Sequence, residues 1–291
     1  MLDTPKSSLV PLPQLVFLQG QFVPEEHAVV SVLDRAFRYG DALFEAALVR
    51  HGKMFRWAQH LARLERSAQF LKIALPYSSD ELSAFARELI ARNELTDGVL
   101  RLQLSRGIGP RGYAPTGQEQ PLVVMSLHPA PPSVSAPWKL TVSSWRIVAN
   151  DPLAYHKTCS RLLQVMAASE ARERGADECV LMNTGGAVTE GSTSNVFWIK
   201  DGTVGTPSLD SGALPGVTRA VVLEICDALG IPRAERVISP EQLPGMDGVF
   251  LTLTSRGVVE AVSLDRQMLH RSPLTARLRA EFEALLAREC A

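Results

Sequence analysis

The stretch that decides the fold reads Val188-Thr189-Glu190-Gly191-Ser192-Thr193-Ser194-Asn195-Val196-Phe197. In it, one carboxylate, one amide and a cluster of hydroxyl groups come directly before an apolar segment. One interpretation is a polar loop that closes a hairpin. The other is that Glu190 faces a cationic heteroaromatic nitrogen. A carboxylate in that place keeps a pyridine nitrogen protonated, and the ring can then accept electrons from a carbanion.

Strands and a helix are predicted on both sides of this loop. Residues 178–182 are predicted as a strand. Residues 195–199 and 203–204 are predicted as a hairpin, because Asp201-Gly202 between them is a strong turn signal. The pattern of residues 218–229 predicts a helix, which ends where a glycine and then a proline follow.

The segment Leu214-Pro215-Gly216-Val217-Thr218-Arg219 opens that helix. Free backbone amides at a helix N-terminus form a natural anion site. The alternative is plain capping, with Thr218 as the N-cap and no ligand. Further hydroxyls and amides come from Thr252-Leu253-Thr254-Ser255, at the end of a strand predicted over residues 249–254.

Lys157 lies in Tyr155-His156-Lys157-Thr158-Cys159-Ser160-Arg161-Leu162, just before a predicted helix that Ser160 would cap and that runs to Gly175. Most lysines are solvated surface residues. A lysine whose amine is kept deprotonated by burial or by neighbouring charge can instead form a Schiff base. For Lys157 taken alone, both interpretations stay open.

A proline-rich stretch divides the chain near its middle. Four prolines between His128 and Pro137 exclude a helix interior or a central strand there. We therefore expect an α+β protein of two domains, a small one over residues 1–128 and a larger one over 138–291, joined by a stiff linker at 129–137. In the first half, strands are predicted over 28–33, 41–49, 99–104 and 121–127, and helices over 57–72 and from 79 or 80 to 93.

Two segments of the first half contain candidate anion-binding arginines. Arg63 lies off the apolar stripe of its predicted helix, where most arginines are solvated or pair with glutamate, but a guanidinium also suits bidentate phosphate binding. The loop of residues 105–113 is shaped by glycine and proline. Its Arg111 and Tyr113 could together hold a carboxylate, or the loop is an ordinary surface loop.

Composition excludes several classes of protein. The chain has 291 residues and a net charge of −1, which argues against a nucleic-acid or anionic-membrane partner. No apolar run approaches the roughly 18 residues of a membrane span, and we expect no signal peptide at the N-terminus. The dispersed cysteines and histidines favour a reduced cytoplasm and argue against a disulfide framework or a metal site. The cysteines are Cys159, Cys179, Cys226 and Cys290.

Together and in this order, these segments resemble one family. The chain is similar to the fold-type IV pyridoxal-phosphate enzymes, which are the branched-chain aminotransferases, the D-amino-acid aminotransferases and the aminodeoxychorismate lyases. The resemblance extends over most of the chain. Its matching segments are Asp34-Arg35-Ala36-Phe37-Arg38-Tyr39-Gly40-Asp41-Ala42-Leu43-Phe44-Glu45, His60-Leu61-Ala62-Arg63-Leu64, Lys157, Thr189-Glu190-Gly191-Ser192-Thr193-Ser194-Asn195 and Leu214-Pro215-Gly216-Val217-Thr218-Arg219.

The resemblance implies a role for each matching residue. Lys157 would hold pyridoxal 5′-phosphate as an internal aldimine and move the proton, and Glu190 would contact the pyridine nitrogen. Arg63 would bind the phosphate. The resemblance also implies two α+β domains with the cofactor between them, and a homodimer in which a partner loop reaches into the site. Further cofactor contacts would come from Ser194, Asn195, Gly216, Val217, Thr218, Thr254 and Ser255, with Arg146 near the cofactor.

The members of this family share the cofactor-binding residues, so the residues that would face the substrate must distinguish between their reactions. The loop of residues 106–113 and the step from Arg146 to Lys157 are similar to the lyases. The dipeptide Phe44-Glu45 is similar to the aminotransferases, as are the Thr-Glu-Gly-Ser and Leu-Pro-Gly-Val-Thr-Arg runs. The carboxylate trap of the D-amino-acid enzymes is incomplete, because Tyr113 replaces their histidine and Phe44 replaces their tyrosine. Thr158-Cys159 departs from the branched-chain enzymes.

We therefore expect an aminotransferase that moves an amino group between an amino acid and a 2-oxo acid. Phe44, Arg111 and Tyr113 would face the substrate. One alternative is a 4-amino-4-deoxychorismate lyase that releases pyruvate and p-aminobenzoate. The other is a non-catalytic protein that binds a phosphate ligand at the helix end, although such a binder needs neither Lys157 nor Glu190.

Overall fold

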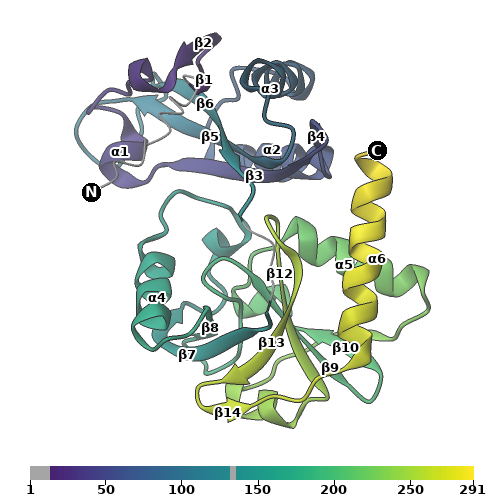
Figure 1. The fold of residues 1–291 in the computed structure, drawn as a ribbon. Helices are drawn as coiled ribbons and strands as arrows, with labels where there is room; N and C mark the ends of the chain where they lie inside the picture. Colours follow the sequence, from purple (N-terminus) through teal and green to yellow (C-terminus); the bar gives the residue numbers. More distant parts are fainter. Residues whose placement is uncertain (1–13, 132–135) are drawn as a thin grey trace, which may run out of the picture.

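The computed structural model of the protein describes residues 14–131, here called the N-terminal half, and residues 136–291, the C-terminal half. Each half contains one sheet with helices packed against it (Figure 1). This arrangement confirms the expected α+β class.

The N-terminal half is built on an antiparallel sheet with the strand order β2-β1-β6-β5-β3-β4. Apolar side chains from the sheet and from α2 and α3 form its core. Helix α3 begins with a capping box, in which Ser78 and Glu81 satisfy each other's backbone amides. The elements are β1 (Leu15–Leu18), β2 (Gln21–Pro24), α1 (Arg35–Tyr39), β3 (Ala42–Arg50), β4 (Lys53–Met54), α2 (Trp57–Leu71), α3 (Ser79–Asn93), β5 (Gly98–Ile108) and β6 (Gln120–Pro129).

The C-terminal half is built on a mixed sheet with the strand order β11-β10-β9-β12-β13-β7-β8, and β14 pairs with β13. Helices α5 and α6 pack against this sheet near β12 and β13, and α4 packs against β7 and β8. The elements are β7 (Trp138–Ile147), α4 (Leu162–Glu173), β8 (Glu178–Asn183), β9 (Asn195–Lys200), β10 (Thr203–Thr206), α5 (Val217–Ala228), β11 (Arg233–Glu235), β12 (Gly248–Leu253), β13 (Gly257–Leu264), β14 (Gln267–Met268) and α6 (Pro273–Glu289).

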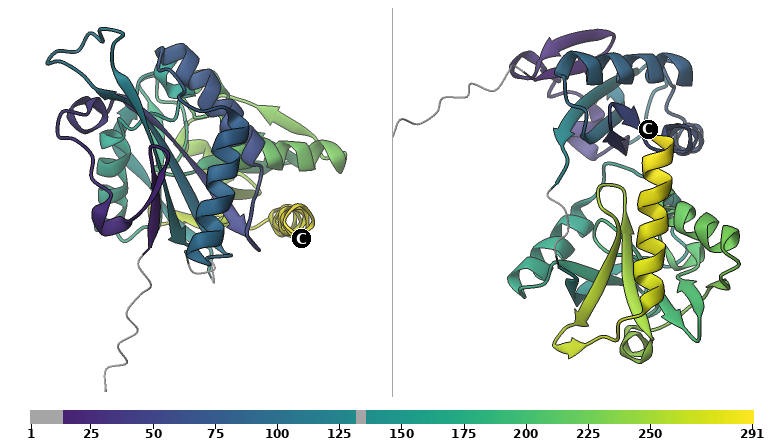
Figure 2. Two further views of the ribbon diagram at one scale, coloured as in Figure 1. Left: turned by 90° about the horizontal axis from the view of Figure 1, so that it is seen from above. Right: turned by 45° about the vertical axis from the view of Figure 1, so that its right-hand side comes forward.

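The two halves contact each other in two places. One is the backbone at residues 157–158, which pairs with β3, and the other is α6. The backbone of Lys157 accepts a hydrogen bond from the amide of Phe44 on β3 (2.9 Å), and Thr158 forms a bridge with Leu43. Helix α6 runs from the C-terminal half up to the N-terminal half (Figure 2). There Arg56, next to α2, pairs with Glu289 at 3.0 Å. The lysine segment is therefore anchored to the sheet of the other half.

One predicted strand is wrong and two helix starts differ. Residues 28–33 form no strand, and Val29 and Val32 are largely exposed. An apolar run makes a strand only where a neighbouring strand accepts its backbone hydrogen bonds, and this run has none. Helix α4 begins at Leu162 with Arg161 as N-cap, not Ser160. Helix α5 has Gly216 as its N-cap, not Thr218.

The predicted linker is only partly covered by the structure. Residues 132–135 of the stretch 129–137 lie outside the described residues. Strand β6 of the first sheet ends at Pro129, and β7 of the second begins at Trp138. The exact domain boundaries stay a prediction. None of the helices in the described ranges is long and apolar enough to cross a membrane.

Candidate active site

A cavity of about 780 Å³ is lined by residues from both halves. Strand β3 contributes Phe44, and β5 contributes Arg101. The alternation of side chains along β3 explains this placement, because Phe44 points into the cavity while its neighbours Leu43 and Glu45 point toward α2. The C-terminal half contributes the segment around Lys157, the loop around Glu190 and the turn after β12.

Lys157 presents its amine to this cavity. Its Nζ lies 4.5 Å from the centre of the Phe44 ring. Burial lowers the pKa of Lys157 to about 7, and the positive charges of Arg63 and Arg161 act in the same direction, against the opposite effect of Glu45 and Glu190. A large part of the amine is therefore neutral near pH 7, which is the form that attacks a carbonyl carbon.

Glu190 lies on the loop between β8 and β9 and lines the same cavity. Its Oε2 accepts a hydrogen bond from the Leu214 amide at 2.8 Å, which orients the carboxylate. Burial raises the pKa of Glu190, while the Leu214 amide, Arg161 and Lys157 oppose that effect. A cationic N–H in the cavity would stabilise the charged carboxylate further. The geometry thus fits the hypothesis that Glu190 faces a protonated ring nitrogen.

Glu178 shapes the loop that holds Glu190, and the sequence-based prediction missed it. Its carboxylate accepts hydrogen bonds from the backbone amides and the hydroxyls of Ser192 and Thr193, and from the hydroxyl of Ser194. The hydroxyls of the motif therefore bind this buried carboxylate. The only signal in the sequence was an acidic residue at the start of a predicted strand.

The N-terminus of α5 follows a turn that reaches the cavity, whose wall includes Leu214. Its N-cap Gly216 supplies no side-chain hydrogen bond, so the first amides of the helix, at Val217 and Thr218, are not capped. A Cβ at Gly216 would lie 2.1 Å from Oδ1 of Asn195, so any larger residue would displace that side chain. Asn195 also holds the preceding turn, because its Nδ2 donates to the Leu214 carbonyl at 2.9 Å. Thr254 and Ser255 follow β12 and line the cavity.

Arg63 reaches this helix end from α2. Its Nη1 donates to the Pro215 carbonyl at 2.8 Å, one residue before the N-cap. Its Nε and Nη2 both donate to the buried Glu45. Arg63 is close enough to lower the pKa of Lys157. The structure therefore brings Arg63 next to the turn before α5. Among the described residues, the cavity wall includes neither Arg63 nor Gly216, Val217 and Thr218, and their role toward a phosphate stays a prediction.

Two arginines that were not predicted from the sequence as site residues face the cavity. Arg101 lies over the Phe44 ring at 4.1 Å, and burial lowers its pKa. In the part of the chain that the structure describes, no carboxylate lies within ion-pair distance of its guanidinium. Arg161 is tied by its Nε to the Thr158 carbonyl (3.0 Å) and lies near Lys157 and Glu190. The alternation predicted over residues 99–104 placed Arg101 on the polar face of a strand. It gave no indication that this face lines a cavity.

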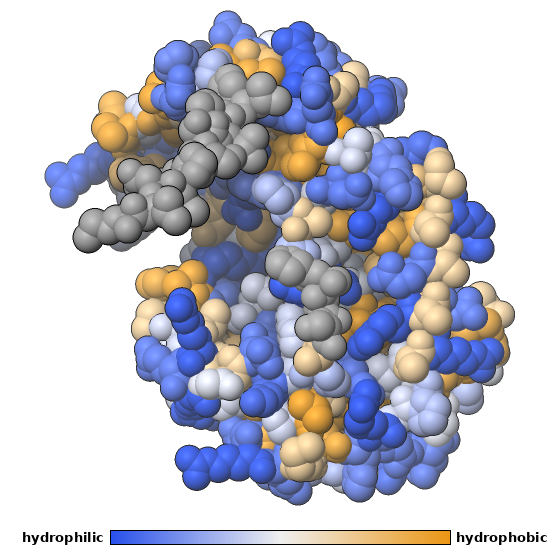
Figure 3. All heavy atoms as spheres, viewed as in Figure 1, coloured by the Kyte–Doolittle hydropathy of each residue, from blue (hydrophilic) through white to orange (hydrophobic). Residues whose placement is uncertain are grey.

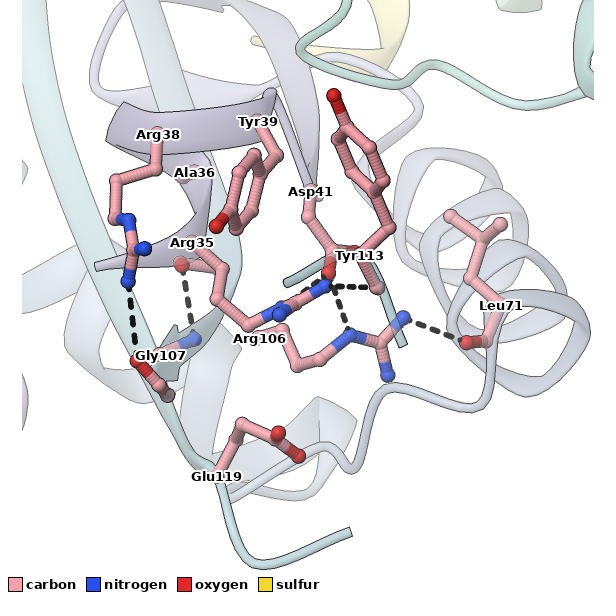
Figure 4. Close-up of polar contacts among 12 residues, drawn as sticks. Arg35, Ala36, Arg38, Tyr39, Asp41, Leu71, Arg106, Gly107, Tyr113 and Glu119 are labelled. Carbon is pink, nitrogen blue, oxygen red and sulfur yellow. Dashed lines mark hydrogen bonds and ion pairs between the residues drawn. The ribbon is translucent and has the colours of Figure 1, made fainter. Parts of the chain in front are cut away.

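Arg111 and Tyr113 lie elsewhere, on an exposed loop held by α1. Figure 4 shows Tyr113 beside Arg35 and Tyr39 of that helix. Arg35 donates to the carbonyls of Gly112 (3.0 Å) and Tyr113 (2.6 Å), and Arg38 donates to the Gly109 carbonyl at 3.2 Å. Among the described residues, neither Arg111 nor Tyr113 lines the cavity of its own chain. Their predicted role toward substrate therefore stays a prediction that requires a second subunit.

Arg35, which holds this loop, also shares a carboxylate with Arg106. Asp41 accepts hydrogen bonds from Nε of Arg35 (2.7 Å) and Nε of Arg106 (2.8 Å), as Figure 4 shows. Arg106 also donates to the carbonyls that end α2. Arg146, which the resemblance placed near the cofactor, is exposed on β7 and donates to the carbonyls of Ser143 and Trp145. Among the described residues it is not part of the cavity wall.

Comparison with known proteins identifies the family of this chain. The model of the family "Amino-transferase class IV" matches residues 42–264. A D-alanine aminotransferase of Staphylococcus aureus is 32% identical, over 92% of this chain and 96% of its own length. Among solved structures, a branched-chain amino acid aminotransferase from Escherichia coli has a TM-score of 0.88 and 30% identity, over 94% of this chain and 94% of that one.

A third similar protein has a different activity in its name. A putative 4-amino-4-deoxychorismate lyase of Legionella pneumophila has a TM-score of 0.84 and 27% identity, over 92% of this chain and 97% of that one. The neighbours thus share the fold while their names differ in reaction. Because the family model covers most of the chain and the relatives match it nearly end to end, the protein belongs to the class IV aminotransferases.

Proposed function

We propose that this protein is a pyridoxal-phosphate-dependent aminotransferase that moves an amino group between an amino acid and a 2-oxo acid. The observation that carries the proposal is that Lys157 and Glu190 line one cavity, with Glu190 bound to the Leu214 amide in the turn before α5. A protein that only bound a phosphate ligand would need the helix end. It would need neither a lysine with a lowered pKa nor a buried carboxylate.

The donor set fits the cofactor chemically. Lys157 would bind it covalently, and Glu190 would accept from its ring nitrogen. The phosphate would lie at the amides of Val217 and Thr218, with Arg63 near them and Thr254 and Ser255 as further donors. When bound, pyridoxal phosphate supplies an aromatic ring that accepts the electrons of the broken Cα bond.

The protein's own part in the reaction is to orient and to move a proton. Lys157 has an amine that gains and loses a proton near pH 7, so its Nζ suits the transfer of the substrate's Cα proton. Glu190 is fixed by the Leu214 amide and presents negative charge to the cavity. Phe44 packs beside the amine and limits its movement. These groups favour the transfer of a proton and an amino group at one face of the cavity.

The substrate carboxylate is assigned to Arg101. Its guanidinium lies in the cavity wall, where, within the described residues, it lies over the Phe44 ring and near the Cys159 thiol. A partly buried cation with no carboxylate partner is stabilised by an anionic ligand. Arg161 adds positive charge near the same ring, at 5.9 Å from its centre.

Replacement of Arg101 by glutamine is expected to raise KM for amino acids and oxo acids by roughly 10- to 100-fold, since a hydrogen bond to a charged group contributes ~1.5–3 kcal/mol. The kcat is expected to change much less, because Lys157 and Glu190 remain in place. Steady-state kinetics measures both constants. The control is Arg92→Gln on the exposed face of α3, where only Glu88 is its ion-pair partner. A wild-type KM in Arg101→Gln would contradict this assignment.

The aminotransferase and the lyase make different products from different substrates. We expect several amino acids of an L and D panel to convert the bound cofactor to its amine form, with a shift in its absorption band and release of a 2-oxo acid. The lyase alternative, which the Legionella pneumophila structure and the loop 106–113 favour, predicts pyruvate and p-aminobenzoate from aminodeoxychorismate. If aminodeoxychorismate yields these products and no amino acid of the panel changes the absorption of the bound cofactor, the protein is a lyase and the proposed transamination is wrong.

We also infer a homodimer, in which the loop with Arg111 and Tyr113 reaches the cavity of the second subunit. Tyr113 is 86% exposed although the backbone of its loop is held in place. Exposed apolar side chains gather in patches on both halves (Figure 3). Phe37 next to that loop and Leu162 on α4 are among the most exposed of them. A sedimentation mass of a single chain would contradict the inference.

A further inference from the structure

Glu45 lies at the centre of a buried polar network in the N-terminal half. Its Oε1 and Oε2 accept two hydrogen bonds from Arg63, at 2.8 and 2.7 Å, and Oε2 also contacts Nδ1 of His60 at 2.8 Å. All three residues are at most 4% exposed. The carboxylate comes from β3, and the other two groups come from α2. The network therefore connects the sheet to the helix that covers it.

The protonation states of this network are fixed by its geometry. Burial alone would raise the pKa of Glu45, but Arg63 and His60 together lower it to about 2. Burial lowers the pKa of His60, so its ring is neutral near pH 7. A carboxylate only accepts hydrogen bonds, so Nδ1 of His60 is the donor. Glu45 thus receives three donors and stays charged at every ordinary pH.

Arg63 binds both Glu45 and the Pro215 carbonyl, and two of its N–H groups are left over. A guanidinium has five N–H groups. Nε and Nη2 each use one toward Glu45, and Nη1 uses one toward the Pro215 carbonyl. Two N–H groups remain, one on Nη1 and one on Nη2. Pro215 directly precedes Gly216, the N-cap of α5, so the guanidinium lies next to the turn before that helix.

We propose that Glu45 and His60 are positioning residues that hold the Arg63 guanidinium at the phosphate end of the cavity. This inference rests on the proposed function, because it concerns a cofactor with a phosphate group. Neither residue lines the cavity among those described. Both act through Arg63, whose long side chain would otherwise sample many rotamers and lose entropy on binding an anion. A buried ion pair by itself is a weak source of stability, so a purely structural role explains this arrangement poorly.

The test is the dissociation constant of pyridoxal phosphate. Protein freed of cofactor is titrated with pyridoxal phosphate and followed by the absorption of the bound form. We expect Glu45→Gln to raise the dissociation constant about tenfold or more, as loss of an outer partner commonly does at ligand sites. Glutamine keeps the shape but replaces one acceptor with a donor that faces the N–H groups of Arg63. Arg63→Met is expected to have a larger effect.

The double variant separates positioning from general destabilisation. If Glu45 acts through Arg63, Glu45→Gln adds no further weakening when Arg63→Met is already present. The control is Arg56→Met at the start of α2, which removes the ion pairs that this side chain makes with Glu224 and Glu289 of the other half. The control is expected to lower the unfolding temperature and to leave the dissociation constant unchanged. Circular dichroism checks that each variant is folded.

Several outcomes would overturn the inference. A wild-type dissociation constant in Glu45→Gln would do so, and so would independent, additive effects of Glu45→Gln and Arg63→Met. If Glu45→Gln does not fold, His60→Phe takes its place, because it removes one donor to Glu45 while keeping an aromatic ring; unchanged affinity there counts against the inference. Wild-type protein that binds no pyridoxal phosphate at all would contradict the proposed function itself, which is a distinguishable result.

Discussion

Replacement of Lys157 by alanine is expected to reduce transamination by at least about 10⁴-fold, because one side chain supplies both the nucleophile and the proton carrier. The alanine variant also loses the covalent link, so borohydride reduction should leave no cofactor on the protein, whereas wild-type protein should be labelled at Lys157. Peptide mass spectrometry after reduction locates the label. The control is Lys139→Ala, because Lys139 is an exposed lysine on β7.

The pH dependence of cofactor uptake provides an independent check on Lys157. Its pKa is lowered to about 7 from the ordinary value of 10.5, so the neutral, nucleophilic fraction rises as the pH increases through 7. The rate at which cofactor-free protein takes up pyridoxal phosphate should therefore rise over that range and level off above it. A rate that still rises steeply between pH 9 and 10 would mean that Lys157 has a normal pKa. A protein that stays colourless with added cofactor would contradict the whole proposal.

Replacement of Glu190 by alanine is expected to keep the cofactor bound and to lose most of the rate. Lys157 can still form the covalent link and Arg63 stays next to the turn before α5, so affinity should fall only moderately. The rate should fall on the order of 10²- to 10³-fold, as when one group that stabilises transition-state charge is removed. Without the carboxylate, the ring nitrogen is no longer kept protonated and the ring accepts electrons less readily.

A second variant separates charge from structure at this position. Glu190→Gln can still accept the hydrogen bond from the Leu214 amide, so the turn before α5 should stay in place. It lacks the negative charge, so its rate should be nearly as low as that of Glu190→Ala. Kinetics of both variants, together with absorption spectra of the bound cofactor, make the comparison. A rate close to wild type in either variant would show that Glu190 is not the partner of the ring nitrogen.

Local patterns predicted most elements of the fold. The alternation of side chains predicted over residues 41–49 corresponds to β3. The helical spacing of apolar residues predicted over residues 57–72 corresponds to α2. The Asp201-Gly202 turn predicted the hairpin of β9 and β10. These signals are strong because they depend on neighbours within a few residues. The apolar segment at residues 28–33 carried a similar signal and formed no strand, because a strand also requires a pairing partner from a distant part of the chain.

The sequence by itself indicated the class of chemistry, because the segments around Lys157 and Glu190, together and in order, resemble one family of enzymes. It left open which side chains surround those two. Only the tertiary structure decided that Glu178 holds the loop of Glu190, that Glu45 holds Arg63 and that Arg101 faces the cavity. The physical reason is distance along the chain: Glu45 and Pro215 meet at one guanidinium although they belong to different halves. Side-chain contacts of that kind leave no local pattern from which they could be predicted.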